Sequence, residues 1–274
     1  MTVLTSAAEL AGQLEDVVLL DVRWALGSTT GRDDHRAGHL PGAVYVDLDT
    51  ELAAPASAAG GRHPLPSLQA LQSNARRWGV SDGSRVVVYD ATGGLAAARA
   101  WWLLRWGGLQ DVTILDGGLK AWTAAGGTLE SGEVTPAPGN VTLTGGGMPV
   151  ISADEAAALA DGDGVLLDAR AGERYRGEVE PVDLRAGHVP GAVSAPTAAN
   201  LDADGRFRTA AVLSERFAAL GVRPGTAVGV YCGSGVTAAH AVAALAEAGI
   251  EAALWPGSWS QWSADPARPV ATGP

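Results

Sequence analysis

The sequence predicts an α/β protein of two similar domains, each with a parallel sheet flanked by helices. Short apolar runs typical of buried strands alternate with segments of helical periodicity, an order that produces parallel β-α-β units. The same series of motifs also occurs twice along the chain. The length of 274 residues is sufficient for two domains of ordinary size.

The repeated motifs define the two copies. Residues 17–22, Val-Val-Leu-Leu-Asp-Val, form an apolar run of the kind found in buried strands, and residues 165–169, Val-Leu-Leu-Asp-Ala, repeat it. The motif Arg-Ala-Gly-His-Leu-Pro-Gly-Ala-Val at 36–44 returns at 185–193 with one substitution. Two further pairs complete the series: residues 85–90 with 227–232, and residues 115–122 with 255–262. A long unit that is present twice indicates two tandem domains rather than a solenoid.

The repeats also suggest where the domains begin and end. We expect an N-terminal domain over residues 1–130 and a C-terminal domain over residues 150–274. Segment 131–149 contains Pro136 and Pro138, is rich in glycine and lacks periodicity, so it is the predicted linker. Each half, at about 130 residues, is large enough to bury its own core.

Composition limits the partners and the compartment. The formal net charge of −11 argues against nucleic acid or an anionic membrane as a partner, because both bind basic faces. Cys232 is the only cysteine, so an intramolecular disulfide and a multi-cysteine metal site are excluded. The histidines lack metal-ligand spacing, and we predict neither a metal nor a cofactor. Without a signal-peptide pattern or an apolar run of about 18 residues, we expect a cytoplasmic protein with a reduced thiol.

Cys232 lies where an apolar run meets a helical pattern. The run Val228–Tyr231 precedes it, and apolar residues at helical spacing follow. A side chain on such a turn is presented at the carboxyl edge of a parallel sheet, where ligands bind. Gly233 and Gly235 allow the backbone to curl so that amide N–H groups and the positive helix end face the sulfur, which favours the thiolate. The alternative is a small buried apolar side chain, but the glycines favour a reactive one.

The motifs after this run resemble those of a known family. Residues 232–237 read Cys-Gly-Ser-Gly-Val-Thr, and residues 257–262 read Gly-Ser-Trp-Ser-Gln-Trp. Together they resemble the active-site loop and the following signature of rhodanese-type sulfurtransferases, in particular the 3-mercaptopyruvate branch. The resemblance implies two tandem rhodanese-like domains, in which a cysteine carries sulfur as a persulfide. In the first half Asp90 occupies the position of the cysteine. A carboxylate cannot carry sulfur, so the N-terminal domain is expected to be catalytically silent.

The chemistry of a persulfide suggests roles for the loop. A thiolate at Cys232 attacks the donor sulfur and holds it as a persulfide, which divides the transfer into two displacements. The N–H groups of the loop would stabilise the outer sulfur, and Ser234 and Thr237 could add hydroxyl donors. For Thr237 an equally good alternative is the cap of the following helix. The predicted cradle consists of Gly233, Gly235, Val236 and Thr237.

The resemblance also implies a substrate-binding arginine. Arg174 matches the family arginine whose guanidinium binds a carboxylate in two hydrogen bonds. The 3-mercaptopyruvate branch has a second arginine nine residues later, and this chain has Asp183 there. Arg185 and Arg176 are the candidates to replace it. A solvated surface position is the alternative for Arg174.

Three further side chains have implied catalytic or binding roles. His39 matches a family histidine proposed to relay a proton, and the expected chain runs from Ser234 through His39 to Asp33. However, His188 occupies the equivalent motif in the other half, which favours a structural role for both histidines. Trp24 matches an aromatic residue that the family places against the active-site sulfur. Trp259 is a second candidate for such a wall, and packing in the core is the alternative for both.

The loop sequence discriminates between possible donors. Thiosulfate-preferring relatives carry Arg-Lys after the cysteine, which suits a dianion, whereas Gly233 and Ser234 follow it here. Phosphatases with a related loop need an arginine where this chain has Ala238. We therefore expect sulfur transfer from 3-mercaptopyruvate to a thiol, a thioredoxin-like protein or cyanide. A thiosulfate-preferring enzyme and a non-catalytic module for binding or persulfide sensing are the alternatives.

Overall fold

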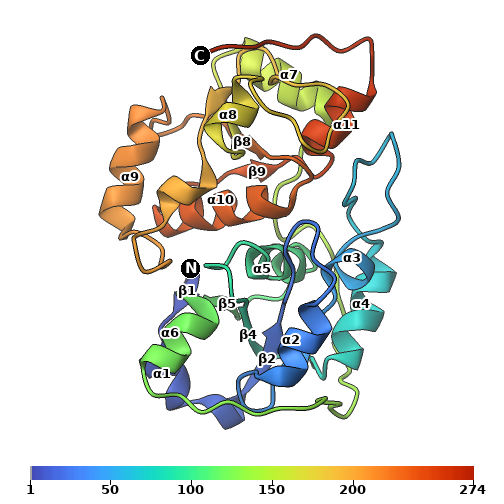
Figure 1. Ribbon diagram of the computed structural model, residues 1–274, viewed down its shortest axis with the longest axis vertical. Helices are drawn as coiled ribbons and strands as arrows, with labels where there is room; N and C mark the ends of the chain where they lie inside the picture. Colours follow the sequence, from blue (N-terminus) through green and yellow to red (C-terminus); the bar gives the residue numbers. More distant parts are fainter. Residues whose placement is uncertain (1) are drawn as a thin grey trace. The chain divides into compact units, whose positions relative to one another are not determined.

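The computed structural model describes residues 2–274 and divides into two compact units (Figure 1). Unit 1 contains the residues up to Ala54, Pro66–Met148 and Ala203–Phe207. Unit 2 contains Pro55–Leu65, Pro149–Asp202 and Arg208–Pro274. Pro55–Leu65 thus belongs to unit 2, although the residues before and after it belong to unit 1. Ala203–Phe207 belongs to unit 1, although the residues before and after it belong to unit 2.

Unit 1 is built on a parallel sheet. Within its described residues the sheet has 5 strands in the order β1-β5-β4-β2-β3. The strands are β1 (Leu4–Thr5), β2 (Val17–Asp21), β3 (Val44–Tyr45), β4 (Arg85–Tyr89) and β5 (Val112–Leu115). The helices are α1 (Ala7–Ala11), η1 (Leu14–Asp16), α2 (Gly31–Ala37), α3 (Leu48–Glu51), α4 (Leu68–Arg77), α5 (Ala97–Trp106) and α6 (Gly118–Ala124). Helix α5 contacts β4 and β5, and an apolar core joins α1 and α6 to side chains of β2, β4 and β5.

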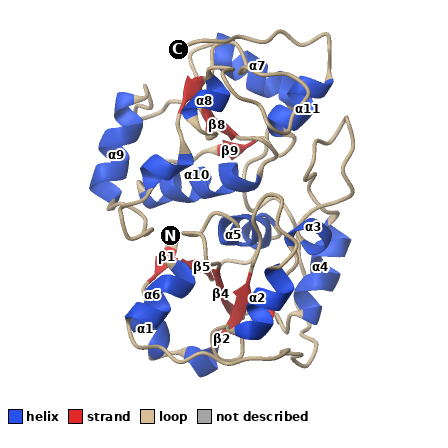
Figure 2. Cartoon of the chain, viewed as in Figure 1, coloured by secondary structure: helices blue, strands red, loops and turns tan. Residues whose placement is uncertain are grey.

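Unit 2 repeats this architecture with a smaller sheet. Its described residues form a 4-stranded parallel sheet in the order β7-β6-β8-β9. The strands are β6 (Val165–Asp168), β7 (Val193–Ser194), β8 (Val228–Tyr231) and β9 (Ala253–Leu254). The helices are α7 (Ala153–Asp161), α8 (Gly172–Tyr175), η2 (Thr197–Asn200), α9 (Ala210–Ala219), α10 (Val236–Glu247) and α11 (Ser258–Ala264). Figure 2 shows β8 and β9 between α10 on one side and α7 and α11 on the other.

The internal repeat is visible in matching contacts of the two units. Asp21 ends β2 and accepts a hydrogen bond of 2.7 Å from Arg23 Nε, while Asp168 ends β6 and accepts one of 2.6 Å from Arg170 Nη2. The first helix of each unit begins with a capping box, in which a serine and the glutamate three residues later satisfy each other's backbone N–H groups. The predicted α/β fold with a parallel sheet flanked by helices in each half is confirmed.

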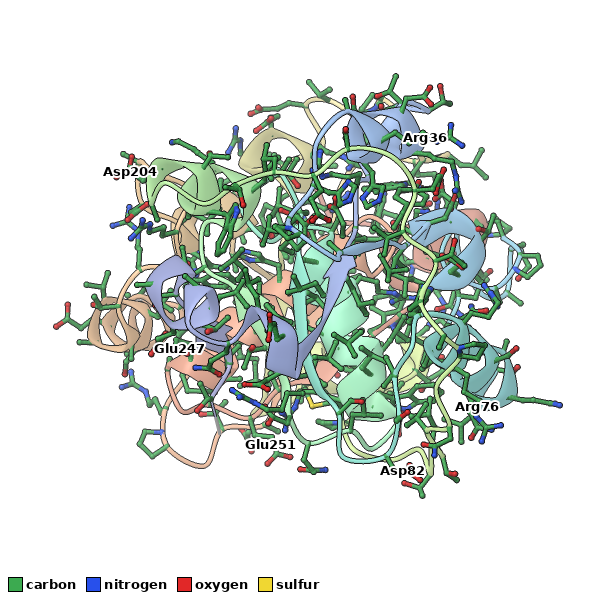
Figure 3. The ribbon with its side chains drawn as sticks, turned by 90° about the horizontal axis from the view of Figure 1, so that it is seen from below. Arg36, Arg76, Asp82, Asp204, Glu247 and Glu251 are labelled. Atoms are coloured by element: carbon green, nitrogen blue, oxygen red, sulfur yellow. The ribbon has the colours of Figure 1, made fainter. Side chains whose placement is uncertain are left out.

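The predicted linker, segment 131–149, forms no helix or strand. As far as Met148 it belongs to unit 1. Arg76 Nε donates to the Val141 carbonyl at 2.9 Å, and Asp82 accepts from the Thr142 amide at 2.9 Å; both anchoring side chains are labelled in Figure 3. Most of this segment is therefore fixed on the surface of unit 1 rather than free between domains.

No helix within residues 2–274 combines the length and the apolar character that crossing a bilayer requires.

Candidate active site

Cys232 follows directly after β8, the strand between β6 and β9 in the sheet of unit 2. All four residues of β8 are buried, since helices cover both faces of the sheet, and Cys232 itself is only 2% exposed. The chain then turns at Gly235 and enters α10. Gly235 has a φ of 78°, and a Cβ there would lie 2.5 Å from the Pro256 carbonyl oxygen. Both the left-handed backbone and this close approach require glycine.

The sulfur lies at the positive end of a helix. The Gly235 amide donates to Cys232 Sγ at 3.1 Å, and the 12-residue helix α10 begins at the next residue. An amide N–H and a helix N-terminus both stabilise negative charge, which suits a sulfur that acts as a nucleophile. Val236 is buried and Thr237 is half-buried in the first helical turn. Their contribution to a cradle for the outer persulfide sulfur stays a prediction.

Helix α11 holds the Cys232 loop in place. Ser258 Oγ accepts the Cys232 amide at 3.1 Å and donates to the Trp255 carbonyl at 2.9 Å. The Trp259 amide donates to the Cys232 carbonyl at 3.0 Å. Ser258 has a φ of 53°, which is unusual for a residue with a side chain. Such a strained backbone persists only where the surrounding contacts compensate for the strain. The Gly-Ser-Trp motif at 257–259 therefore positions the loop, a role that the sequence reasoning did not assign to Ser258.

Ser234 is paired with a histidine, but it is His63. His63 Nδ1 lies 2.8 Å from Ser234 Oγ, and both residues are almost fully buried. His63 comes from Pro55–Leu65, the segment that belongs to unit 2 although it lies early in the sequence. The sequence reasoning considered His63 only as a metal ligand and missed it as a partner. The sequence signal that could have identified His63 is Gly-Gly-Arg-His-Pro at 60–64, in which two glycines precede two ionisable side chains.

His39 and Asp33 have other partners within unit 1, and their chain to Ser234 stays a prediction. His39 is fully buried in unit 1, its Nδ1 lies 2.8 Å from the His35 carbonyl oxygen, and its ring stacks on His35 at 4.0 Å. The Asp33 side chain is 77% exposed and pairs with Arg36. His188 repeats the His39 arrangement, with Nδ1 2.7 Å from a backbone carbonyl and a stacked ring at 3.7 Å. These matching contacts favour the structural alternative for both histidines.

Two arginines approach Gly233, the residue after the cysteine. A Cβ on Gly233 would lie 3.0 Å from Arg62 Nη2 and 3.4 Å from Arg174 Nη1. Arg174 Nη2 donates to Glu180 at 2.6 Å and to Asp183 at 3.1 Å. Arg62 Nη1 forms an ion pair with Asp183. Arg174 therefore lies at the loop as predicted from the resemblance, and Arg62 was missed.

The two acids of this cluster differ in their titration. Burial raises the pKa of Asp183, although Arg62 and Arg174 act in the opposite direction. Burial also works against ionisation of Glu180, but hydrogen bonds from Arg174 and from two backbone amides lower its pKa. The pKa values of the two carboxyl groups are therefore shifted in opposite directions.

The candidates for the second arginine have other partners. The Arg185 guanidinium donates to four backbone carbonyls of residues 262–268. Arg176 pairs with Glu178 on the surface. These contacts indicate structural roles for both.

The two tryptophans proposed as walls lie in different units. Trp259 is fully buried in unit 2, with Arg170 stacked 4.6 Å above its ring and its Nε1 donating to the Arg185 carbonyl. It belongs to the core of that unit. Trp24 is half-buried in unit 1, where its Nε1 donates to Asp49 at 3.0 Å.

Comparison with known proteins identifies the family. The model of the rhodanese-like domain matches residues 6–125 and again residues 152–265. The chain belongs to the rhodanese-like family. Its two matched segments confirm the predicted pair of tandem rhodanese-like domains.

The relatives of this rhodanese-like chain are sulfurtransferases. A Mycobacterium tuberculosis protein with the provisional name thiosulfate sulfurtransferase SseB is 50% identical over 279 residues, which cover 99% of this chain and 97% of that protein. A Pseudomonas aeruginosa protein, provisionally named 3-mercaptopyruvate sulfurtransferase, is 46% identical over 278 residues, 98% of each chain. The crystal structure of SseA from Escherichia coli, described as a 3-mercaptopyruvate sulfotransferase, superposes with a TM-score of 0.84 at 31% identity and covers 95% of this chain and 100% of that one. The predicted enzyme class, sulfurtransferase, is confirmed.

Proposed function

We propose that the protein transfers sulfur from 3-mercaptopyruvate through a persulfide on Cys232 to a thiol acceptor. The proposal rests mainly on the pair formed by Ser234 and His63 beside the nucleophile. Breaking the carbon–sulfur bond of 3-mercaptopyruvate leaves an enolate of pyruvate, which needs a proton. Thiosulfate releases sulfite, which leaves without one. A hydroxyl and an imidazole in hydrogen-bond contact next to the cysteine therefore favour the first donor.

The first displacement forms the persulfide. The Cys232 thiolate attacks the thiol sulfur of the donor, a sulfur–sulfur bond forms, and the electron pair of the breaking carbon–sulfur bond passes to the pyruvate enolate. Ser234 Oγ, in contact with His63 Nδ1, would deliver a proton to the methylene carbon. The proton of the donor thiol replaces the one that Ser234 gives up, so that pyruvate and an enzyme persulfide are the products.

The second displacement discharges the persulfide. The acceptor thiolate attacks the outer sulfur, and Cys232 leaves as a thiolate that the Gly235 amide and the N-terminus of α10 stabilise. A small thiol, a thioredoxin-like protein or cyanide has the required nucleophile. The free thiol of Cys232 also supports a reducing, cytoplasmic compartment.

Thiosulfate is the second candidate donor. The name of the Mycobacterium tuberculosis relative favours it. The loop after Cys232 supports it less well, because Gly233 and Ser234 carry no charge to hold a dianion. A module that only binds or senses persulfides would need no proton donor beside the cysteine.

Mass spectrometry of the intact protein tests the proposal. After incubation with 3-mercaptopyruvate we expect the mass of one added sulfur atom on Cys232, which cyanide removes as thiocyanate. The Cys232→Ser variant is the control and should gain nothing. Faster loading by thiosulfate would favour the second donor, and the absence of an adduct with either donor would favour the binding module.

A further inference from the structure

Two guanidinium groups from distant parts of the sequence face one residue of the catalytic loop. Arg174 belongs to α8, and Arg62 belongs to the Pro55–Leu65 segment. Arg174 Nη1 and Arg62 Nη2 are the nitrogen atoms nearest to the position of a Cβ on Gly233, at 3.4 Å and 3.0 Å. The side chains are 16% and 26% exposed, which allows contact with a small solute.

Asp183 fixes the spacing between these two groups. Its Oδ1 pairs with Arg62 Nη1 and its Oδ2 accepts from Arg174 Nη2. Each guanidinium thus uses one terminal nitrogen on Asp183 and directs the other toward Gly233. Within residues 2–274, Arg62 Nη2 and Arg174 Nη1 have no hydrogen-bond partner in the protein. Two fixed donors beside the nucleophile are a preorganised site for an anion.

The charge balance of the cluster suits a small anionic charge. Asp183 and Glu180, whose side chains are both 4% exposed, offset the charges of Arg62 and Arg174. The positive ends that remain face the loop. A carboxylate with a single negative charge can accept one hydrogen bond from each arginine, whereas a dianion would leave more charge uncompensated.

We propose that Arg62 is a substrate-binding residue that supplies, together with Arg174, the second guanidinium for the carboxylate of the donor. Asp183 is the spacer that holds both arginines, which explains an acidic residue where the family resemblance implies an arginine. This inference rests on the proposed function, because 3-mercaptopyruvate carries the carboxylate. Arg62 and Arg174 would together select a donor that carries a carboxylate.

A recess lined in part by Arg62 and Asp183 lies at one side of this cluster. It measures about 310 Å³, and its lining includes Arg62, Asp183, Leu184, Ser260 and Ser263. The Arg62 amide donates to Ser260 Oγ at 3.0 Å. The backbone of Arg62 is therefore anchored to α11, the helix that also holds the Cys232 loop.

Steady-state kinetics with 3-mercaptopyruvate test the assignment. Arg62→Met should lower kcat/KM by about 10-fold to 100-fold, mainly through KM, because a charge-assisted hydrogen bond to substrate is lost. Arg62→Lys keeps the charge without the planar donor fork and should recover part of this loss. Arg176→Met, which removes an exposed arginine paired with Glu178, is the matched control and should change little.

A second measurement separates donor binding from the rest of the cycle. Discharge of a preformed Cys232 persulfide by cyanide involves no carboxylate, so Arg62→Met should lower that rate much less than it lowers kcat/KM for 3-mercaptopyruvate. If Arg62→Met retains wild-type KM while Arg174→Met does not, the inference is overturned and the proposed function stands. If the wild-type protein forms no persulfide with 3-mercaptopyruvate, the proposed function fails first and the inference fails with it.

Discussion

The two units have equivalent loops after strands β4 and β8, and the side chain at the start of each loop forms different backbone hydrogen bonds. In unit 2 the loop after β8 presents the Cys232 sulfur, which accepts one backbone hydrogen bond, from Gly235 at 3.1 Å. In unit 1 the loop after β4 contains Asp90, whose carboxylate accepts four backbone N–H groups. These donors are the amides of Thr92, Gly94, Ala96 and Ala97, at 2.8 to 3.0 Å.

This difference gives a physical reason for the prediction that the N-terminal domain is catalytically silent. The Asp90 carboxylate occupies the loop of its own domain, so the amides that could hold an external anion are already bonded. Within residues 2–274, the Cys232 sulfur accepts one backbone hydrogen bond, from the Gly235 amide. We infer that the other amides of the Cys232 loop stay available for the outer sulfur of a persulfide. Loop amides that already bond to a carboxylate of the protein serve the structure, whereas loop amides with no such partner can bind a reacting group.

Removing the nucleophile of unit 2 should have the largest effect on turnover. Cys232→Ser should lower turnover at least about 1000-fold, because a hydroxyl at this position is a poor nucleophile and cannot hold sulfur as a persulfide. The free energy of unfolding should change by less than about 1 kcal/mol, since serine retains the size of the side chain. Activity assays and urea denaturation measure the two quantities. Turnover that survives the substitution would contradict the assigned nucleophile.

The reciprocal change in the first domain should have the opposite profile. Asp90→Ala leaves four backbone N–H groups without their acceptor, in a residue that is 1% exposed. We expect a loss of about 3–5 kcal/mol in the free energy of unfolding, because unsatisfied buried donors are costly. Asp90→Asn keeps an acceptor oxygen and should lose less. Urea denaturation followed by tryptophan fluorescence measures both, and equal stability of Asp90→Ala and the wild type would remove the structural role.

The proposed proton-donating pair of Ser234 and His63 sharpens the comparison, because both residues belong to unit 2. Ser234→Ala should lower kcat with 3-mercaptopyruvate by about 100-fold, the ordinary value of a positioned proton donor. The rate of persulfide formation from thiosulfate should stay close to that of the wild type, because sulfite needs no proton. Single-turnover loading with each donor measures the two rates. An equal loss with both donors would assign Ser234 to the persulfide cradle instead.

Asp183 should control the choice of donor, with the smallest effect. Asp183→Asn keeps the shape and one acceptor oxygen but removes a negative charge between Arg62 and Arg174. We expect the ratio of kcat/KM for thiosulfate to that for 3-mercaptopyruvate to rise about 3-fold to 10-fold, because extra positive charge favours the dianion. Glu178→Gln, at an exposed glutamate paired with Arg176, is the control. An unchanged ratio would mean that Asp183 only positions the arginines.

Acid should act in the same direction as this substitution. Burial raises the pKa of Asp183, so this group is charged above its pKa and becomes neutral as the pH falls through it. The donor ratio of the wild type should therefore rise on acidification, and that of Asp183→Asn should rise less. Parallel pH profiles of the two proteins would contradict this role.

The fold could be predicted because each local pattern agrees with the global one. The apolar runs that end in Asp21 and Asp168 became equivalent parallel strands, and the turn at Cys232 lies at the carboxyl edge of its sheet as expected. The turn was predicted from Gly233 and Gly235, and the backbone at Gly235 is left-handed, a conformation that favours glycine. These features depend on residues close together in the sequence.

The site residues that were not predicted depend on contacts between distant parts of the sequence. His63 and Arg62 contact residues 171 and 121 positions away in the sequence, and no periodicity reports such a pairing. The segment that carries them was assigned to the N-terminal half because it lies there in the sequence. Conversely, His39 attracted attention through a motif that the second half repeats with His188, and a repeated motif reports shared architecture rather than catalysis.

The placement of Pro55–Leu65 in unit 2 has a practical consequence for dissecting the protein. A fragment made of residues 150–274 would keep Cys232, Ser234 and Arg174 but would lack the imidazole and the second guanidinium. Truncation at the sequence midpoint therefore separates the nucleophile from its helpers, and a recombinant catalytic half must carry a grafted copy of residues 55–65. The segment 55–65 therefore ties the proposed activity of unit 2 to a piece of chain from the N-terminal half of the sequence.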